Sequence, residues 1–161
     1  MTTELTLFAD YHQIHLFDEG SSTDLGEAWS GRAVDDQVAL GGDAMAVGTV
    51  SDMDVLVTVQ VLDQPPAIDV ADFDHVLEAS LQVSSGRLVV MGCTDFEPDA
   101  ARFDVPAGQV RVRVAKSNMA AADEADIDSD DPASMERLEL QVWPAATAPA
   151  VVLKRWAAPD S

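Results

Sequence analysis

The sequence predicts an all-β fold, a single-domain antiparallel β-sandwich of about seven or eight strands with a long acidic loop. Apolar and polar residues alternate with a period of two in most segments of the 161-residue chain, as is typical of half-buried strands. No long run has the spacing of an amphipathic helix, and short turns rich in glycine, proline and serine separate the alternating segments. We expect residues 1–144 to form the sandwich and residues 145–161 to be an Ala/Pro-rich C-terminal tail, whose apolar run at 151–153 either docks on the sheet or adds an edge strand.

The first half of the chain is expected to supply the following strands. Residues 5–17 predict one long or bent strand, or two strands without a hairpin between them. A short strand is expected at residues 44–47. Residues 55–63 carry valines on one face and leucines on the other, which predicts a central strand covered on both sides. The segment DLGEAWSGRAVDD is too short and too interrupted by glycine to predict a helix.

Two β-hairpins and a final strand are expected in the second half. Residues 75–83 alternate, turn at SSG and return as RLVVMGC, and residues 101–105 turn at PAG into QVRVRVA. In the second hairpin the valines face the core, while Arg111 and Arg113 face outward. The alternation of RLELQVW at residues 137–143 predicts the last strand of the sandwich.

Charge is the strongest compositional signal. Twenty-nine acidic residues oppose nine basic ones, so the formal net charge is -20. Such a surface repels nucleic acid and anionic membranes and attracts basic partners. A compositional bias of the whole host proteome would give the same excess, and this alternative stays open.

Compartment and membrane class follow from the apolar runs and the single cysteine. No run is long enough for a transmembrane helix, and no basic residue precedes an apolar stretch near the N-terminus, as a secretory signal would require. One cysteine, Cys93, allows no internal disulfide and fits a reducing compartment. We expect a cytoplasmic protein that does not bind membranes.

The acidic segment at residues 117–134 contains DIDSDD, in which Asp126, Asp128 and Asp130 have the spacing of the first ligands of an EF-hand loop. The sixth position is Asp131 where glycine is needed, and the twelfth is Arg137 where a bidentate glutamate is needed. We therefore expect a solvated, mobile loop, with no metal and no cofactor.

The candidate catalytic residues are few. On a strand, His12 and His15 would point to opposite sides, and with His75 and Cys93 they form no zinc set of the usual spacing. Cys93 ends an apolar strand, where a buried and inert thiol is expected. Motifs of hydrolases, phosphate-binding loops and dinucleotide sites are absent from the sequence. A hydrolase using Cys93 or a histidine is the weakest alternative, and we expect a protein that is not an enzyme.

Several short motifs resemble a known family. Tyr11-His12-Gln13 is followed by an apolar residue, an acidic serine-rich turn and Trp29, then by the apolar strand at residues 55–61 and by RFDVPAGQVRVRV at residues 102–114. In this order they resemble the bacterial competence protein J family, whose members inhibit the DNA-entry nuclease. The resemblance covers residues 5–143, and the acidic loop and the tail look like additions to it.

The resemblance implies a non-catalytic protein that masks a basic partner, possible partners including a nuclease. It also implies that Tyr11, His12, Gln13 and Trp29 are structural, and we place the first three in an early strand. Loop carboxylates would contact the partner by charge complementarity. They are Asp18, Glu19 and Asp24 in the first loop, and Asp123, Glu124, Asp126, Asp128, Asp130 and Asp131 in the long one. A small β-sandwich module for another ligand or protein, acidic only because of its host, is the alternative.

Overall fold

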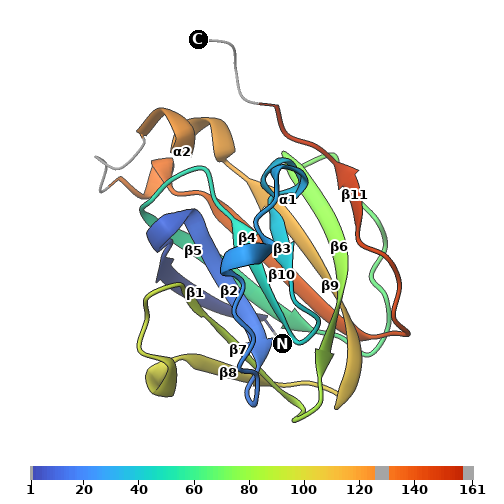
Figure 1. The fold of residues 1–161 in the computed structure, drawn as a ribbon. Coiled ribbons are helices and arrows are strands. Elements are labelled where there is room, and N and C mark those ends of the chain that lie inside the picture. Colours follow the sequence, from blue (N-terminus) through green and yellow to red (C-terminus); the bar gives the residue numbers. More distant parts are fainter. Residues whose placement is uncertain (1, 126–130, 158–161) are drawn as a thin grey trace.

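The computed structural model describes residues 2–125 and 131–157 and consists of two β-sheets packed face to face (Figure 1). Sheet A has six strands in the order β1 (Thr2–Phe8), β5 (Asp54–Val61), β10 (Arg137–Pro144), β9 (Gly108–Ser117), β6 (His75–Val83) and β11 (Val151–Lys154). Sheet B has five, in the order β3 (Val38–Leu40), β4 (Ala44–Gly48), β2 (Gln13–Asp18), β7 (Arg87–Gly92) and β8 (Ala101–Asp104). The predicted all-β sandwich is confirmed, with eleven strands in the described residues.

The core lies between the two sheets and is built by the alternation seen in the sequence. Val55, Val57 and Val59 of β5 face inward with at most 1% exposure, opposite Ile14 and Leu16 of β2, which are fully buried. Inward-facing valines recur on β9, and both strands therefore bury one apolar face. Every strand pair is antiparallel except β5 and β10, which run parallel, so sheet A is mixed.

Residues 5–17 form two strands that belong to different sheets. The second of the two predicted alternatives is therefore correct. β1 ends at Phe8, a single 3₁₀ turn, η1 (Asp10–His12), follows, and β2 continues in sheet B. Tyr11 and His12 have φ of 56° and 58°, a left-handed conformation that interrupts extended backbone. The placement of Tyr11 and His12 in an early strand was therefore wrong, and only Gln13 lies in one.

Neither predicted hairpin is a hairpin. The turn at SSG joins β6 of sheet A to β7 of sheet B, and the turn at PAG joins β8 of sheet B to β9 of sheet A. Both turns lie at the same end of the sandwich, where the Val105 N–H donates to the Gly86 carbonyl at 3.0 Å. Period-two alternation fixes which face of each strand is buried, but two consecutive strands meet this requirement equally well across the core or side by side.

The acidic segment is partly folded, contrary to the expectation of a solvated loop. Residues 119–125 form α2 (Met119–Ala125), in which Met119 and Ala122 are fully buried. Asn118, with φ of 60°, donates its side-chain amide to the carbonyls of Ala133 and Met135 at 2.9 and 2.7 Å, which fixes the return of the chain through η4 (Pro132–Ser134). Most of DIDSDD, residues 126–130, lies outside the described residues.

Two arginines fasten the segments that cover the outer face of sheet A. Arg111 and Arg113 point outward as predicted, yet they are only 7% and 5% exposed. Arg111 donates to the Ala148 and Pro149 carbonyls, both at 2.9 Å. Arg113 donates to the Ala67 carbonyl at 2.8 Å and pairs with Glu78. These contacts hold the β5–β6 connection and the chain after β10 against the sheet.

The C-terminal segment adds an edge strand. β11 pairs antiparallel with β6, and this decides between the two alternatives for the apolar run at 151–153. The remaining helices, η2 (Gly26–Ala28), α1 (Gly31–Asp36) and η3 (Glu97–Asp99), are each of one or two turns. Within the described ranges, no helix has the length and apolar character needed to cross a membrane.

Candidate functional site

A pocket of about 330 Å³ lies between the η1 turn, α1 and the end of β4. We call it the Trp29 pocket. Its lining residues are Tyr11, His12, Gln13, Trp29, Val34, Gln37, Gly48, Thr49 and Val50. The consecutive family-motif residues Tyr11, His12 and Gln13 therefore meet Trp29, which lies 16 residues after Gln13, at one place.

The first wall is the η1 turn and the indole of Trp29. Gln13 Oε1 accepts a hydrogen bond from Trp29 Nε1 at 3.3 Å and lies 2.8 Å from His15 Nε2, so the amide fixes the orientation of the indole. Tyr11 is 68% exposed and projects from the left-handed turn at the rim. Neighbouring residues in left-handed backbone cost conformational free energy, and such strain tends to collect at functional sites.

The second wall is α1 and the residue that ends it. Ser30 caps the helix by accepting a hydrogen bond from the Ala33 N–H, and Gln37 ends it in the left-handed conformation with φ of 63°. The Gln37 carbonyl accepts from the Gly48 N–H at 2.8 Å, which ties the helix end to β4. Val34, on the exposed side of α1, is 60% exposed and forms the outer part of this wall.

A buried ion pair lies beneath the pocket. Lys116 and Glu136 are both 0% exposed, and the Lys116 ammonium lies 2.8 Å from Glu136 Oε2. The ammonium also donates to the Gly48 carbonyl at 2.7 Å and to Gln37 Oε1. Burial lowers the pKa of Lys116, while the charge of Glu136 opposes that shift. The pair thereby fixes the two residues, Gln37 and Gly48, that form the inner end of the pocket.

The chemistry of the Trp29 pocket suits binding more than catalysis. An indole, a phenol ring and two valines supply its apolar surface, and the side chains of His12, Gln13, Gln37 and Thr49 are polar. None of its nine lining residues is acidic or a cysteine. The hydroxyl of Thr49, the one aliphatic hydroxyl of the lining, donates to the Ser51 carbonyl at 2.8 Å and is therefore not paired with His12 as a nucleophile with its base.

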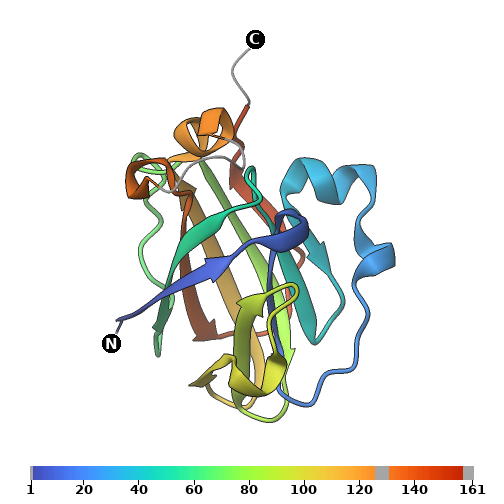
Figure 2. The same cartoon turned by 90° about the vertical axis from the view of Figure 1, so that its left-hand side faces the viewer.

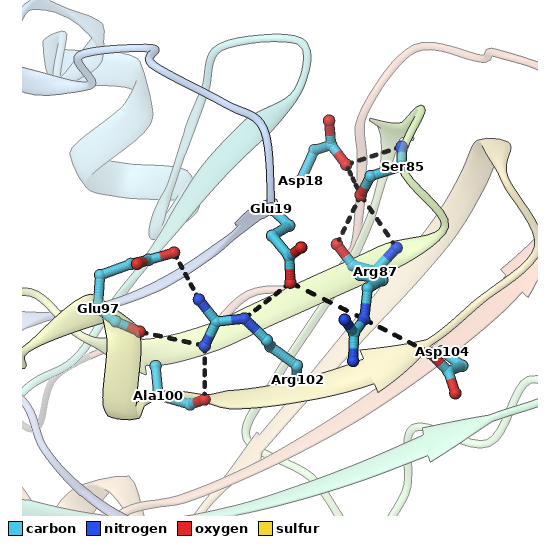
Figure 3. Close-up of polar contacts among 8 residues, drawn as sticks. All are labelled: Asp18, Glu19, Ser85, Arg87, Glu97, Ala100, Arg102 and Asp104. Carbon is cyan, nitrogen blue, oxygen red and sulfur yellow. Dashed lines mark hydrogen bonds and ion pairs between the residues drawn. The ribbon is translucent and has the colours of Figure 1, made fainter.

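Two of the predicted partner-binding carboxylates make hydrogen bonds or ion pairs within the fold. Asp18 is 7% exposed and accepts hydrogen bonds from the N–H of Ser85, at 3.1 Å, and from its hydroxyl (Figure 3). Glu19 lies 2.8 Å from Arg102 Nε and 3.8 Å from Arg87 Nε. The expectation that both stand free in an exposed loop was wrong, because β2 extends to Asp18 and places the two carboxylates against β7 and β8.

Arg102 is the centre of this network. It donates to Glu97 Oε1 at 2.7 Å and to the Ala100 carbonyl at 2.9 Å, and Arg87 lies 3.8 Å from Asp104 (Figure 3). The network joins the end of β2 to β8, the edge strand of sheet B, and to η3. Its geometry therefore has a structural role in holding an edge strand.

The other predicted carboxylates fall in four groups. Asp24 is exposed, and its Oδ1 accepts from the Gly26 N–H at 2.8 Å. Asp123 and Glu124 are exposed on α2. Asp131 is exposed and caps η4. Asp126, Asp128 and Asp130 lie outside the described residues.

Most basic residues are occupied inside the fold. The nine ion pairs in the described part of the chain engage seven bases but only six acids. Arg111, Arg113 and Lys116 are also buried. The cations are thus used within the fold, and the surface carries the excess of carboxylates.

The remaining titratable candidates do not assemble into a catalytic or metal site. Cys93 is half-buried where full burial was expected, and burial together with the charge of Asp10 raises the pKa of its thiol. His15 lies on β2 and His75 is buried on β6. Across residues 2–125 and 131–157, no group of three or more His, Cys, Asp or Glu side chains could hold a metal ion.

The sequence alone did not reveal how the pocket is completed. The motif residues were recognised, but Val34, Gln37 and Gly48 carried no signal, because they come together only when the end of α1 contacts the end of β4 in the folded chain. A lysine at the end of the valine-rich strand β9 was the one available sign of a buried cation. Its partner Glu136 directly precedes the next strand, β10, beyond the acidic segment.

Comparisons with known proteins identify the fold. No family model and no curated protein sequence matches the chain. The structure of ComJ from Bacillus subtilis, inhibitor of the DNA degrading activity of NucA, matches with a TM-score of 0.66 and 12% identity over 90% of this chain and 96% of that one. The structure of crocagin biosynthetic gene J matches with a TM-score of 0.61 and 18% identity over 91% and 98%. The chain thus has the fold of ComJ, and the resemblance to the competence protein J family is supported at the level of the fold.

Proposed function

We propose that this protein is a non-catalytic binding protein that masks a basic protein partner, and that the partner is a nuclease. The observation that carries the proposal is the fold shared with an inhibitor of a DNA-degrading activity along nearly the full length of both chains. The net charge of -20 supports it independently of the fold. We place this function in the cytoplasm, in keeping with a single cysteine that has no disulfide partner.

Electrostatics gives the proposal a mechanism. A nuclease holds phosphates with basic residues, and a surface of carboxylates is complementary to such a site. Opposite potentials also steer the two proteins together and raise the association rate, an effect that salt screens. The exposed carboxylates Asp24, Asp123, Glu124 and Asp131 are the described members of the proposed contact set, which also includes Asp126, Asp128 and Asp130. Asp18 and Glu19 are not in the proposed contact set, because their carboxylates are engaged by Ser85, Arg87 and Arg102 within the fold.

The test is inhibition of NucA, the nuclease that ComJ inhibits, by the purified protein. We expect inhibition and an association rate that falls steeply with salt, since the screening length drops from about 10 Å at 0.1 M to about 3 Å at 1 M. A triple variant, Asp24→Asn, Asp123→Asn and Glu124→Gln, should bind more weakly. The matched control neutralises three exposed acids of the β5–β6 connection, Asp63→Asn, Asp69→Asn and Asp72→Asn.

A binding module for another ligand is the second candidate. The likeness to crocagin biosynthetic gene J favours it, because the same fold then occurs in a biosynthetic setting. In that case the acidity reflects the host, and both triple variants should behave as the parent does. Absence of NucA inhibition at low salt would count against the nuclease-masking function.

A further inference from the structure

We infer that the Trp29 pocket is the anchoring site of the interface, into which a basic protein partner inserts one uncharged apolar side chain. This inference rests on the proposed function and assigns the contact to the η1 turn, α1 and the end of β4. The acidic clusters then steer the encounter, and the pocket supplies the short-range contact. In many interfaces a few well-packed aromatic anchors carry most of the binding free energy.

The pocket is held in shape before any partner arrives. The Lys116 ammonium fixes Gln37 and Gly48 from below through the contacts described above. A Cβ added to Gly48 would come 3.5 Å from Trp29 Cη2, so the indole lies against the backbone of β4. A site fixed by such contacts loses little conformational entropy on binding.

The rim is apolar and unusually exposed. Tyr11 and Val34 are 68% and 60% exposed, on two elements that face each other across the pocket. The volume of about 330 Å³ is near the lower end of the range of ligand pockets, roughly 300–1,000 Å³. It suits one side chain or a single ring and is small for a nucleotide cofactor. The uncharged lining makes burial of a charged group in it costly.

Charge around the pocket specifies the partner. Glu27 in η2 and Asp35 in α1 are exposed and lie close in sequence to Trp29 and Val34. The acidic segment with α2 leaves the sheet just after Lys116 and returns at Glu136, so it begins and ends beside the residues under the pocket. Both α1 and α2 lie toward the same end of the sandwich (Figures 1 and 2). The partner surface that fits the Trp29 pocket is therefore an apolar side chain flanked by Arg or Lys.

The first test probes the pocket directly. Two-dimensional NMR of the full chain is titrated with N-acetyl-leucinamide, with N-acetyl-aspartamide as the matched polar probe. We expect the leucine probe alone to shift the indole N–H of Trp29 and the amides of Gly48 and Thr49, with millimolar affinity. Shifts elsewhere, or equal shifts with both probes, would overturn the inference regardless of any nuclease result.

The second test uses the partner. Tyr11→Asn removes the ring but keeps a residue that tolerates left-handed backbone, and Val34→Ser removes the other rim group. The control is Ile68→Ser, which removes an equally exposed apolar side chain (65%) outside the pocket. NucA inhibition should weaken about tenfold or more for each rim variant and stay unchanged for the control. Thermal unfolding of all variants verifies the fold.

The outcomes separate the two claims. Probe binding without NucA inhibition keeps the pocket as a ligand site and rejects the nuclease-masking function. Inhibition that survives both rim variants rejects the pocket as the anchor and keeps the function. Loss of inhibition in the Ile68→Ser control would show that apolar surface in general is needed, and this too would reject the specific anchor.

Discussion

His75 joins three elements through both nitrogens of its ring. Nε2 donates to the Asp36 carbonyl at the end of α1, at 2.8 Å, and Nδ1 accepts from the Trp156 N–H just after β11, at 3.1 Å. The ring is therefore held neutral, since a proton on Nδ1 would face the Trp156 N–H. Burial lowers the pKa of His75, and the charges of Lys116 and Arg155 add to this, while the Asp36 carbonyl and carboxylate oppose it.

We predict that the protein loses stability as the pH falls through about 6.5, the ordinary pKa of histidine. Below that pH the unfolded chain binds a proton that folded His75 refuses, so the free energy of unfolding falls until the pH passes the folded pKa. Urea unfolding between pH 7.5 and pH 5 measures the slope. His75→Gln should flatten it, though not abolish it, because burial also lowers the pKa of His15. A slope that is the same in parent and variant would disprove the assignment, and exposed His12→Gln is the control.

The Lys116–Glu136 pair gives a second residue-scale prediction. Lys116→Met should destabilise the protein by about 3–5 kcal/mol, because it leaves a buried carboxylate without its cation. Adding Glu136→Gln should recover part of that loss of stability, because the amide oxygen can still accept a hydrogen bond from the Val50 N–H. In the parent this N–H donates to Glu136 Oε1 at 2.8 Å. Chemical denaturation of the two single variants and the double variant measures the coupling. Additive losses would show that the pair is not coupled.

At the scale of elements, Arg113 is expected to hold the β5–β6 connection in place. Its guanidinium contacts Glu78, the Pro66 and Ala67 carbonyls, and the Trp143 ring at 5.3 Å. Arg113→Met should cost about 2–4 kcal/mol and speed hydrogen exchange in residues 62–74. The control is exposed Arg137→Met. Unchanged exchange in that segment would mean that the connection packs without the arginine.

The strands themselves were largely predictable, while their partners were not. Alternation located β5, β6, β9 and β10, because each buries one apolar face. The less predictable strands are short or lie at boundaries: β3, of three residues, was missed, and for β11 at a sheet edge and for the division of residues 5–17 into β1 and β2 the sequence left two alternatives open. In the turn between β1 and β2, Tyr11 and His12 adopt a left-handed backbone conformation, which their residue types do not predict.

At the scale of the whole molecule, we predict that salt stabilises the protein. With a net charge of -20 and most cations already paired, repulsion among surface carboxylates opposes the compact state. Screening weakens that repulsion more than it weakens the buried pairs, so the melting temperature should rise between 20 mM and 500 mM NaCl. Differential scanning calorimetry measures it, with KCl as a second salt. A constant or falling melting temperature would mean that surface repulsion is unimportant.

The repeated crossing between sheets also sets the order in which the chain can fold. Of the nine strand pairs in the described part of the chain, only β3–β4, β7–β8 and β9–β10 join neighbours in sequence. β5 pairs with β10 and β6 with β11, so sheet A remains incomplete on the ribosome until residues 137–154 have been synthesised. Such non-local topology folds on a timescale of roughly milliseconds to seconds, after large loops have closed. A nascent chain that lacks β10 and β11 should therefore stay protease-sensitive, and protection should appear only when residues 137–154 have left the ribosome.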